Sequence, residues 1–185
     1  GDAAQVLAMD AFLAANQGHW LARETIGALR RVLSRLDVSS RSLFAVIDEG
    51  SCFAGTFLEL ALACDRAYQL VLPETPEAAP RIIMSALNFG TYPMATDQSR
   101  LARRFYNDEA TLAALQARVG EALDGDAANA AGLVTGAPDD IDWADELRIA
   151  CEERVAMSPD ALTGMEANLR FNGQENMVTR VFGRL

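Results

Sequence analysis

The chain has 185 residues, half of them apolar and 23% charged, with a formal net charge of −10 at pH 7. This charge argues against nucleic acid or an anionic membrane surface as a partner, because both are bound through clustered Lys and Arg. No apolar run reaches the length of a membrane span, and no basic segment leads into a secretory apolar core. We therefore expect one globular cytoplasmic domain.

The first part of the chain predicts alternating strands and helices. Gln5–Met9 is predicted as a strand, Trp20–Leu36 as a helix with a periodic apolar face, and Leu43–Ile47 as a buried strand. A tight connection bracketed by Gly50 and Gly55 follows, and a helix over residues 56–65 comes next. Its start is placed at Thr56, because Thr56 and Glu59 have the capping-box spacing.

The middle of the chain continues this α/β pattern. We predict a strand over Tyr68–Leu72, a surface loop over the proline-rich Pro73–Pro80, a short strand over Arg81–Met84 and a turn over Gly90–Pro93. Three helices are then predicted, over Gln98–Tyr106, Ala110–Leu123 and Ala127–Ala131.

The last part is predicted to be largely helical. Asp142 can cap the next helix, in which an apolar stripe recurs at three- and four-residue steps: Trp143, Leu147, Ala150, Cys151 and Val155. Ser158 and Pro159 have the N-cap and first-turn signature of another helix, and Glu175–Leu185 is also predicted to be helical.

The turn before Glu59 is the strongest candidate site. A helix start presents free N–H groups and a partial positive charge, so the N–H groups near Gly55 and Thr56 could stabilise a carbonyl oxygen that becomes negative during a reaction. An ordinary glycine turn with a helix cap explains the same residues. Glu59 is likewise open to two interpretations, as an acid or base in catalysis or as a member of the capping box.

Cysteine and histidine content argues against metal chemistry. The odd number of cysteines, Cys52, Cys64 and Cys151, indicates reduced thiols, and their spacing fits no zinc site. His19 is the only histidine. Cys52, within the key turn, is a candidate thiol nucleophile or substrate-binding residue, although a small residue packed in a tight turn accounts for it as well. Asp65 is expected to cap its helix or to pair locally with Arg66.

The passage from Leu43 to Asp65 resembles the crotonase (enoyl-CoA hydratase/isomerase) superfamily, in which a strand, a Gly-rich turn and a helix reading Glu-Leu-Ala-x-x-x-Asp build half of an oxyanion hole. Here that string is Glu59 to Asp65. The string from Ala131 to Val134 resembles the superfamily's Ala-x-x-x-Gly-Leu-Val, which implies a helix that stops at Gly132 and a strand that begins at Leu133. Within the superfamily the chain is similar to the benzoyl-CoA-dihydrodiol lyase family. The similar stretches are 23–27, 37–43, 50–55, 88–91, 93–94, 105–106, 138–144, 157–164, 169–171, Arg180 and 182–185.

The resemblance implies a fold and an activity. The fold would be an α/β crotonase-like (ClpP/crotonase) ββα-superhelix half-domain with C-terminal helices. The activity would be that of a carbon–carbon lyase of aerobic benzoate degradation, which opens the ring of 2,3-epoxybenzoyl-CoA with water to give a semialdehyde CoA ester and formate. Coenzyme A would be part of the substrate, and no separate cofactor or metal is implied.

The same resemblance implies that this chain is the second of two crotonase-like halves, with residues 1–136 as its α/β core and 137–185 as a helical segment. The first half would be its partner, together with an acyl-CoA and a second copy in a homodimer. The Gly-Gly-Gly run of the family's first half is replaced here by Thr56-Phe57 after Gly55. The family's second catalytic glutamate falls at about Ala86, so we expect a supporting half. A generic enoyl-CoA hydratase or isomerase and a non-catalytic structural or dimerisation module remain alternatives.

Binding of an anionic acyl-CoA by this chain would need local positive charge. Two arginine groups could supply it, Arg23, Arg30, Arg31, Arg35 and Arg41 or Arg100, Arg103 and Arg104. Solvated helix faces are the alternative interpretation of both groups.

Overall fold

The computed structural model describes residues 1–39, 41–171 and 176–178. Its strands form two small sheets. In the first, β1 (Phe44–Ile47) and β3 (Arg66–Gln69) run parallel, with Phe44 opposite Arg66. In the second, β4 (Ile82–Ile83) pairs in parallel with β2 (Phe53–Ala54) and antiparallel with β5 (Ala122–Leu123).

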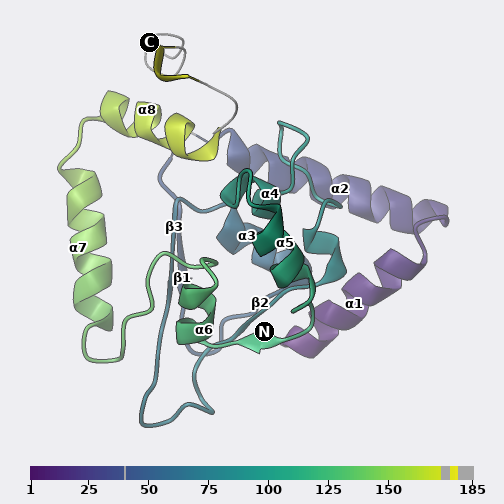
Figure 1. Cartoon of the computed structure of the whole chain (residues 1–185), viewed down its shortest axis with the longest axis horizontal. Coiled ribbons are helices and arrows are strands. Elements are labelled where there is room, and N and C mark those ends of the chain that lie inside the picture. Colours follow the sequence, from purple (N-terminus) through teal and green to yellow (C-terminus); the bar gives the residue numbers. More distant parts are fainter. Residues whose placement is uncertain (40, 172–175, 179–185) are drawn as a thin grey trace.

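Helices surround these strands, with α1 and α2 on one side and α7 and α8 on the other (Figure 1). None of the helices in the described ranges combines the length and the apolar composition that a bilayer crossing requires. The helical elements are α1 (Ala3–Ala15), α2 (Trp20–Asp37), the 3-10 turn η1 (Gly55–Phe57), α3 (Leu58–Leu62), the 3-10 turn η2 (Ala86–Asn88), α4 (Arg100–Arg104), α5 (Glu109–Gln116), α6 (Gly125–Ala130), α7 (Trp143–Val155) and α8 (Pro159–Arg170).

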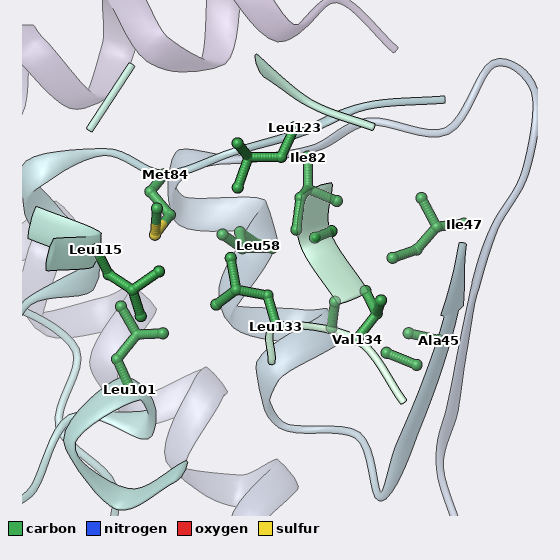
Figure 2. Close-up of a cluster of buried hydrophobic side chains, with 13 residues drawn as sticks. Ala45, Ile47, Leu58, Ile82, Met84, Leu101, Leu115, Leu123, Leu133 and Val134 are labelled. Carbon is green, nitrogen blue, oxygen red and sulfur yellow. The ribbon is translucent and has the colours of Figure 1, made fainter. Parts of the chain in front are cut away.

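One apolar cluster joins the strands to the helices behind them (Figure 2). Ile47 of β1, Leu58 of α3 and Ile82 of β4 are fully buried in it, and Leu101 and Leu133 close it from later in the chain. Burying such side chains is the main favourable contribution to folding. The cluster therefore fixes α3, and with it the turn that precedes α3, against the strands.

The predictions for α2, β1 and β4 are confirmed, as are the loop over Pro73–Pro80 and the turn at Gly90. The strand predicted over Tyr68–Leu72 is β3, which begins two residues earlier at Arg66. Beyond Gln69 it continues only as an isolated bridge between Val71 and Asp139. The three cysteines are free, with Cys52 and Cys64 half-buried and Cys151 exposed.

The strand predicted over Gln5–Met9 is wrong, because this segment lies inside α1. Asp2 caps that helix by accepting the N–H groups of Ala4 and Gln5. A short apolar segment fits either a strand or a helix by periodicity alone. Here six of the 13 residues of α1 are alanines, which favours the helix.

The helix predicted over Ala110–Leu123 ends early, at Gln116. Gly120 has φ of +85° and donates its N–H to the carbonyl of Met84, so the chain turns and returns as β5 beside β4. The stop at Gly132 is confirmed, since Gly132 has φ of +69° and the Leu133 N–H bonds to the Ala128 carbonyl. The strand predicted after it is reduced to an isolated bridge between Gly136 and Tyr68.

The stripe predicted for α7 is only partly correct. Ala150 is buried and Leu147 is half-buried, whereas Cys151 is exposed and Val155 is 85% exposed. Arg154 takes the inward position instead, with its guanidinium 5.6 Å from the centre of the Phe44 ring. Asp142 stands at the N-cap position as predicted, but its side chain accepts no capping hydrogen bond.

Helix α8 begins as predicted, with Ser158 accepting the N–H of Ala161 and Pro159 in the first turn. The predicted helix over Glu175–Leu185 lies outside the described residues, apart from residues 176–178. Polar contacts hold α8 against the strands, because Arg170 donates to both carboxylate oxygens of Asp65 and Ser42 bonds to Glu166. Asp65 therefore pairs with α8 and not with Arg66, which corrects the sequence-based expectation.

The carboxyl of Glu166 makes this contact dependent on pH. Burial and the neighbouring Asp65 raise its pKa to about 6. Burial alone would raise the pKa of Asp65. Hydrogen bonds with Glu166 and Arg170 outweigh this effect and hold the pKa of Asp65 below its usual range. A raised pKa stabilises the folded state while the group is protonated, and this contribution is lost as pH rises through about 6.

We therefore predict that raising the pH from 5 to 7.5 removes on the order of 1 kcal/mol of stability at Glu166. The Glu166→Gln variant cannot ionise at this position and should lack that part of the pH dependence. Urea unfolding of both proteins at the two pH values measures the difference between them. Equal pH dependence in the two proteins would contradict the prediction.

Candidate functional site

The candidate turn is formed where β2 ends and η1 leads into α3. Gly55 has φ of +49°, a conformation that favours glycine. A Cβ atom at this position would lie 2.1 Å from the Oδ2 atom of Asp10. Glycine is therefore required both by the backbone and by the close approach of a carboxylate from α1.

Asp10 occupies the position in which a ligand anion was expected. Its Oδ2 accepts the backbone N–H of Thr56 at 2.8 Å and the hydroxyl of Ser85 at 2.6 Å. Its Oδ1 accepts the Thr56 hydroxyl at 2.5 Å. The carboxylate is 2% exposed and carries negative charge at the start of a helical turn, where such charge is favourable. The N–H of Thr56 is thus already bonded within the chain.

Glu59 is not part of a capping box, so the capping box predicted from the spacing of Thr56 and Glu59 is wrong. The residue that precedes η1 is Ala54, and neither η1 nor α3 has a side-chain cap. The Glu59 side chain accepts hydrogen bonds from Asn88 Nδ2 at 2.7 Å and from Arg100 Nη1 at 2.8 Å. It is 1% exposed, and this burial raises its pKa despite the two donors and the positive charge of Arg100.

Arg100 joins Glu59 to a second buried carboxylate. Its Nη2 donates to both oxygens of Asp37 and to the carbonyl of Leu33. Both ion pairs are almost completely buried. One guanidinium thus serves two carboxylates, and burial raises the pKa of Asp37 as it does that of Glu59. The network links α2, α3 and α4 and holds Glu59 by fixed hydrogen bonds.

Cys52 precedes β2 and is half-buried. Gly1 packs against it, because a Cβ atom added to Gly1 would lie 2.6 Å from the Cβ of Cys52. His19 lies at the start of α2, where its Nδ1 accepts the N–H of Leu21. The ring is therefore used as a helix cap. A role for Cys52 as nucleophile or substrate-binding residue stays a prediction. Within the described ranges, no group of three or more His, Cys, Asp and Glu is placed to hold a metal ion.

The two arginine groups differ in accessibility. Arg100 and Arg103 are buried, and the Nε–H of Arg104 donates to the carbonyl of Gly132 at 2.6 Å. In contrast, Arg30 and Arg31 are exposed and line an open groove of about 350 Å³ between α2 and residues 93–97. Of the two groups, the exposed one on α2 is the one that a dissolved anion can reach.

An apolar groove of about 250 Å³ lies beside α1. Leu7, Ala11 and Ala14 of α1 form one wall, and Asp10 and Ser85 lie at its polar edge. The groove therefore adjoins the site built around Thr56. Its polar groups are already bonded to one another, as described for Asp10.

Sequence reasoning did not bring together the residues that complete this site, and it considered Arg100 only as a possible positive charge for an acyl-CoA. Asp10, Ser85, Asn88, Tyr92 and Arg100 come from α1 and from residues 85–100, far along the chain from Thr56. One signal was available for Asp10, because it is the only charged residue in α1, whose one other polar residue is Gln5. A lone carboxylate in such a helix needs a buried partner or an exposed face.

Comparison with solved structures identifies the fold. An enoyl-CoA hydratase/isomerase from Cupriavidus metallidurans CH34 matches with a TM-score of 0.64 and 21% identity, over 90% of this chain and 58% of that protein. A putative enoyl-CoA hydratase from Thermobifida fusca YX, solved in complex with CoA, matches with a TM-score of 0.58 and 15% identity, over 86% of this chain and 57% of that one. The chain thus has the crotonase fold of the enoyl-CoA hydratase/isomerase class, which confirms the predicted fold class.

Sequence comparison identifies a relative of much higher identity. The chain is 58% identical over all 185 residues to benzoyl-CoA-dihydrodiol lyase from Aromatoleum evansii, and the match covers 33% of that protein. No family model matches the chain. The chain is therefore a relative of benzoyl-CoA-dihydrodiol lyase, as its motifs indicated, and it spans about a third of the length of this curated relative.

Proposed function

We propose that this chain is a supporting crotonase-like unit of a longer cytoplasmic enzyme of the benzoyl-CoA-dihydrodiol lyase type. The longer enzyme would act as a carbon–carbon lyase on an activated benzoyl-CoA derivative, by ring opening of 2,3-epoxybenzoyl-CoA. Its CoA would be part of the substrate, and the reaction would need no separate cofactor. The identity of 58% over the whole chain supports the assignment to this enzyme type.

The occupation of the Thr56 N–H by Asp10 is the observation that carries the supporting role. A thioester oxygen that develops negative charge needs free donors aimed at it. Here the donor at Thr56, the Thr56 hydroxyl and the Ser85 hydroxyl all bond to one internal carboxylate. Asp10 would also repel a developing oxyanion at the same place. A unit built in this way would stabilise the other unit of the enzyme, and that other unit would carry out the reaction.

Glu59 fits the same proposal. A general acid must reach the substrate directly or through one water molecule. Glu59 is fully buried and bonded to Asn88 and Arg100, which gives it a structural role in this unit.

The partner of the unit would be the first crotonase-like half of the same polypeptide. The whole enzyme would be a homodimer, which sedimentation equilibrium of the full-length protein checks.

Calorimetric titration with benzoyl-CoA tests the supporting role, once circular dichroism has established that the purified chain is folded. We expect no saturable binding by the unaltered chain. The Asp10→Asn variant serves as a control, because it keeps the side-chain volume and removes the negative charge. Saturable binding by the unaltered chain that weakens in the Glu59→Gln variant would overturn the proposal and favour a complete enoyl-CoA hydratase or isomerase site.

A further inference from the structure

Helix α1 carries its one charged residue, Asp10, on its buried side, whereas its exposed side carries large apolar residues beside the exposed Gln5. Of its 13 residues only Gln5 and Asp10 are polar, and Asp10 points inward to Thr56. The outward side carries Met9, which is 57% exposed, and Phe12, which is 61% exposed. A helix that is apolar all round is normally buried on all sides. This arrangement therefore indicates a covering partner.

The apolar groove beside α1 extends this surface. Leu7, Ala11 and Ala14 form its wall on the helix. At 100° per residue, Ala8 and Ala15 lie between that wall and Phe12, so the apolar surface continues around α1 from the groove to Phe12. Both alanines are exposed. We call this surface, formed by residues 7–9, 11, 12, 14 and 15, the α1 face.

We propose that the α1 face docks against the remainder of a longer polypeptide of which this chain is one unit, an inference that rests on the proposed function. Two-thirds of the relative from Aromatoleum evansii lies outside the part that matches this chain. A covalently linked partner binds at high effective concentration, so an apolar face of modest size suffices. A second copy of this chain is the less favourable occupant, because each copy carries a net charge of −10.

Oxidation of Met9 reports directly whether the α1 face is covered. The experiment compares the isolated chain with a chimera in which this chain replaces the matching segment of the full-length Aromatoleum evansii enzyme. Dilute hydrogen peroxide converts accessible Met to its sulfoxide, and mass spectrometry gives the rate at each position. Met157 lies between α7 and α8, is 41% exposed and serves as an exposed reference, and Met94 serves as a buried one.

We expect Met9 to be oxidised several-fold more slowly in the chimera than in the isolated chain, approaching the rate of Met94, with Met157 unchanged. Equal rates at Met9 in both proteins would overturn the proposal. A dimer of the isolated chain in sedimentation equilibrium, dissociated by Phe12→Glu, would also overturn it and assign the α1 face to a second copy.

A second measurement applies if the chimera does not fold. Glutamate is placed in the unaltered Aromatoleum evansii enzyme at the position aligned with Phe12. The matched control places it at the position aligned with Ile141, which is 84% exposed here and lies in the loop before α7. A lower melting temperature for the first variant alone is expected, and equal melting temperatures would overturn the docking.

Activity separates this inference from the proposed function. A chimera with protected Met9 that cannot open the ring of 2,3-epoxybenzoyl-CoA contradicts the function and leaves the docking supported.

Discussion

Replacement of Arg100 by methionine should destabilise the protein by about 3–5 kcal/mol, because it leaves Glu59 and Asp37 as buried carboxylates without a counter-charge. Methionine fills a similar volume and supplies no donor. The variant also loses the hydrogen bond to the carbonyl of Leu33. A loss of this size is a large share of the net stability of a domain. Urea unfolding followed by circular dichroism measures it.

Arg118 provides the matched control for this substitution. It forms an ion pair with Glu121 on the surface, and exposed pairs of this kind contribute about 0–1 kcal/mol. Arg118→Met should therefore leave stability nearly unchanged. Adding Glu59→Gln to Arg100→Met should recover part of the loss, because it removes one of the two unpaired charges. If Arg100→Met and Arg118→Met lower the free energy of unfolding equally, the buried network does not stabilise the protein.

Asp10→Ala should cost roughly 3 kcal/mol or more, because three donors lose their common acceptor and buried unsatisfied donors cost about 1–3 kcal/mol each. The truncation also opens a small polar space beside Thr56. Formate carries the same anionic group and fits the chemistry of that space, so added formate should raise the melting temperature of this variant above that of the same variant in chloride.

Asp140→Ala is the control for Asp10→Ala, since Asp140 is exposed in the loop before α7. Its stability should stay close to that of the unaltered chain, with no specific response to formate. If Asp10→Ala unfolds at the same urea concentration as Asp140→Ala, the carboxylate at Thr56 is not a structural element, and the argument for a closed site fails with it.

Local sequence signals predicted most of the elements near the site. The apolar run up to Ile47, the glycine at position 55 and the proline-rich loop each act over a few residues, and each is where it was expected. Ser158 and Pro159 likewise set the start of α8. The error over Gln5–Met9 has the same local origin, because a short apolar segment fits both periodicities until its cap is considered.

Long-range partners account for what the sequence could not predict at the site. Glu59 has the spacing of a capping residue, yet its side chain bonds to Asn88 and Arg100, 29 and 41 positions away. Sequence spacing alone does not show whether Glu59 caps its own helix or bonds to the buried guanidinium of Arg100, which the fold brings to 2.8 Å from its carboxylate. The strength of charge-assisted hydrogen bonds decides the outcome once the chain is packed.

The position of Asp10 in the chain also constrains the order in which the protein can be completed during synthesis. Its carboxylate accepts hydrogen bonds from Thr56, 46 residues later in the chain, and from Ser85, 75 residues later. On the ribosome, α1 emerges before Thr56 and Ser85, so its carboxylate lacks the full set of donors until Ser85 has left the exit tunnel. Contacts between such distant positions form late, since closing a long loop costs entropy before any contact repays it. Through that interval the nascent chain exposes an apolar helix, which is the kind of segment that chaperones bind.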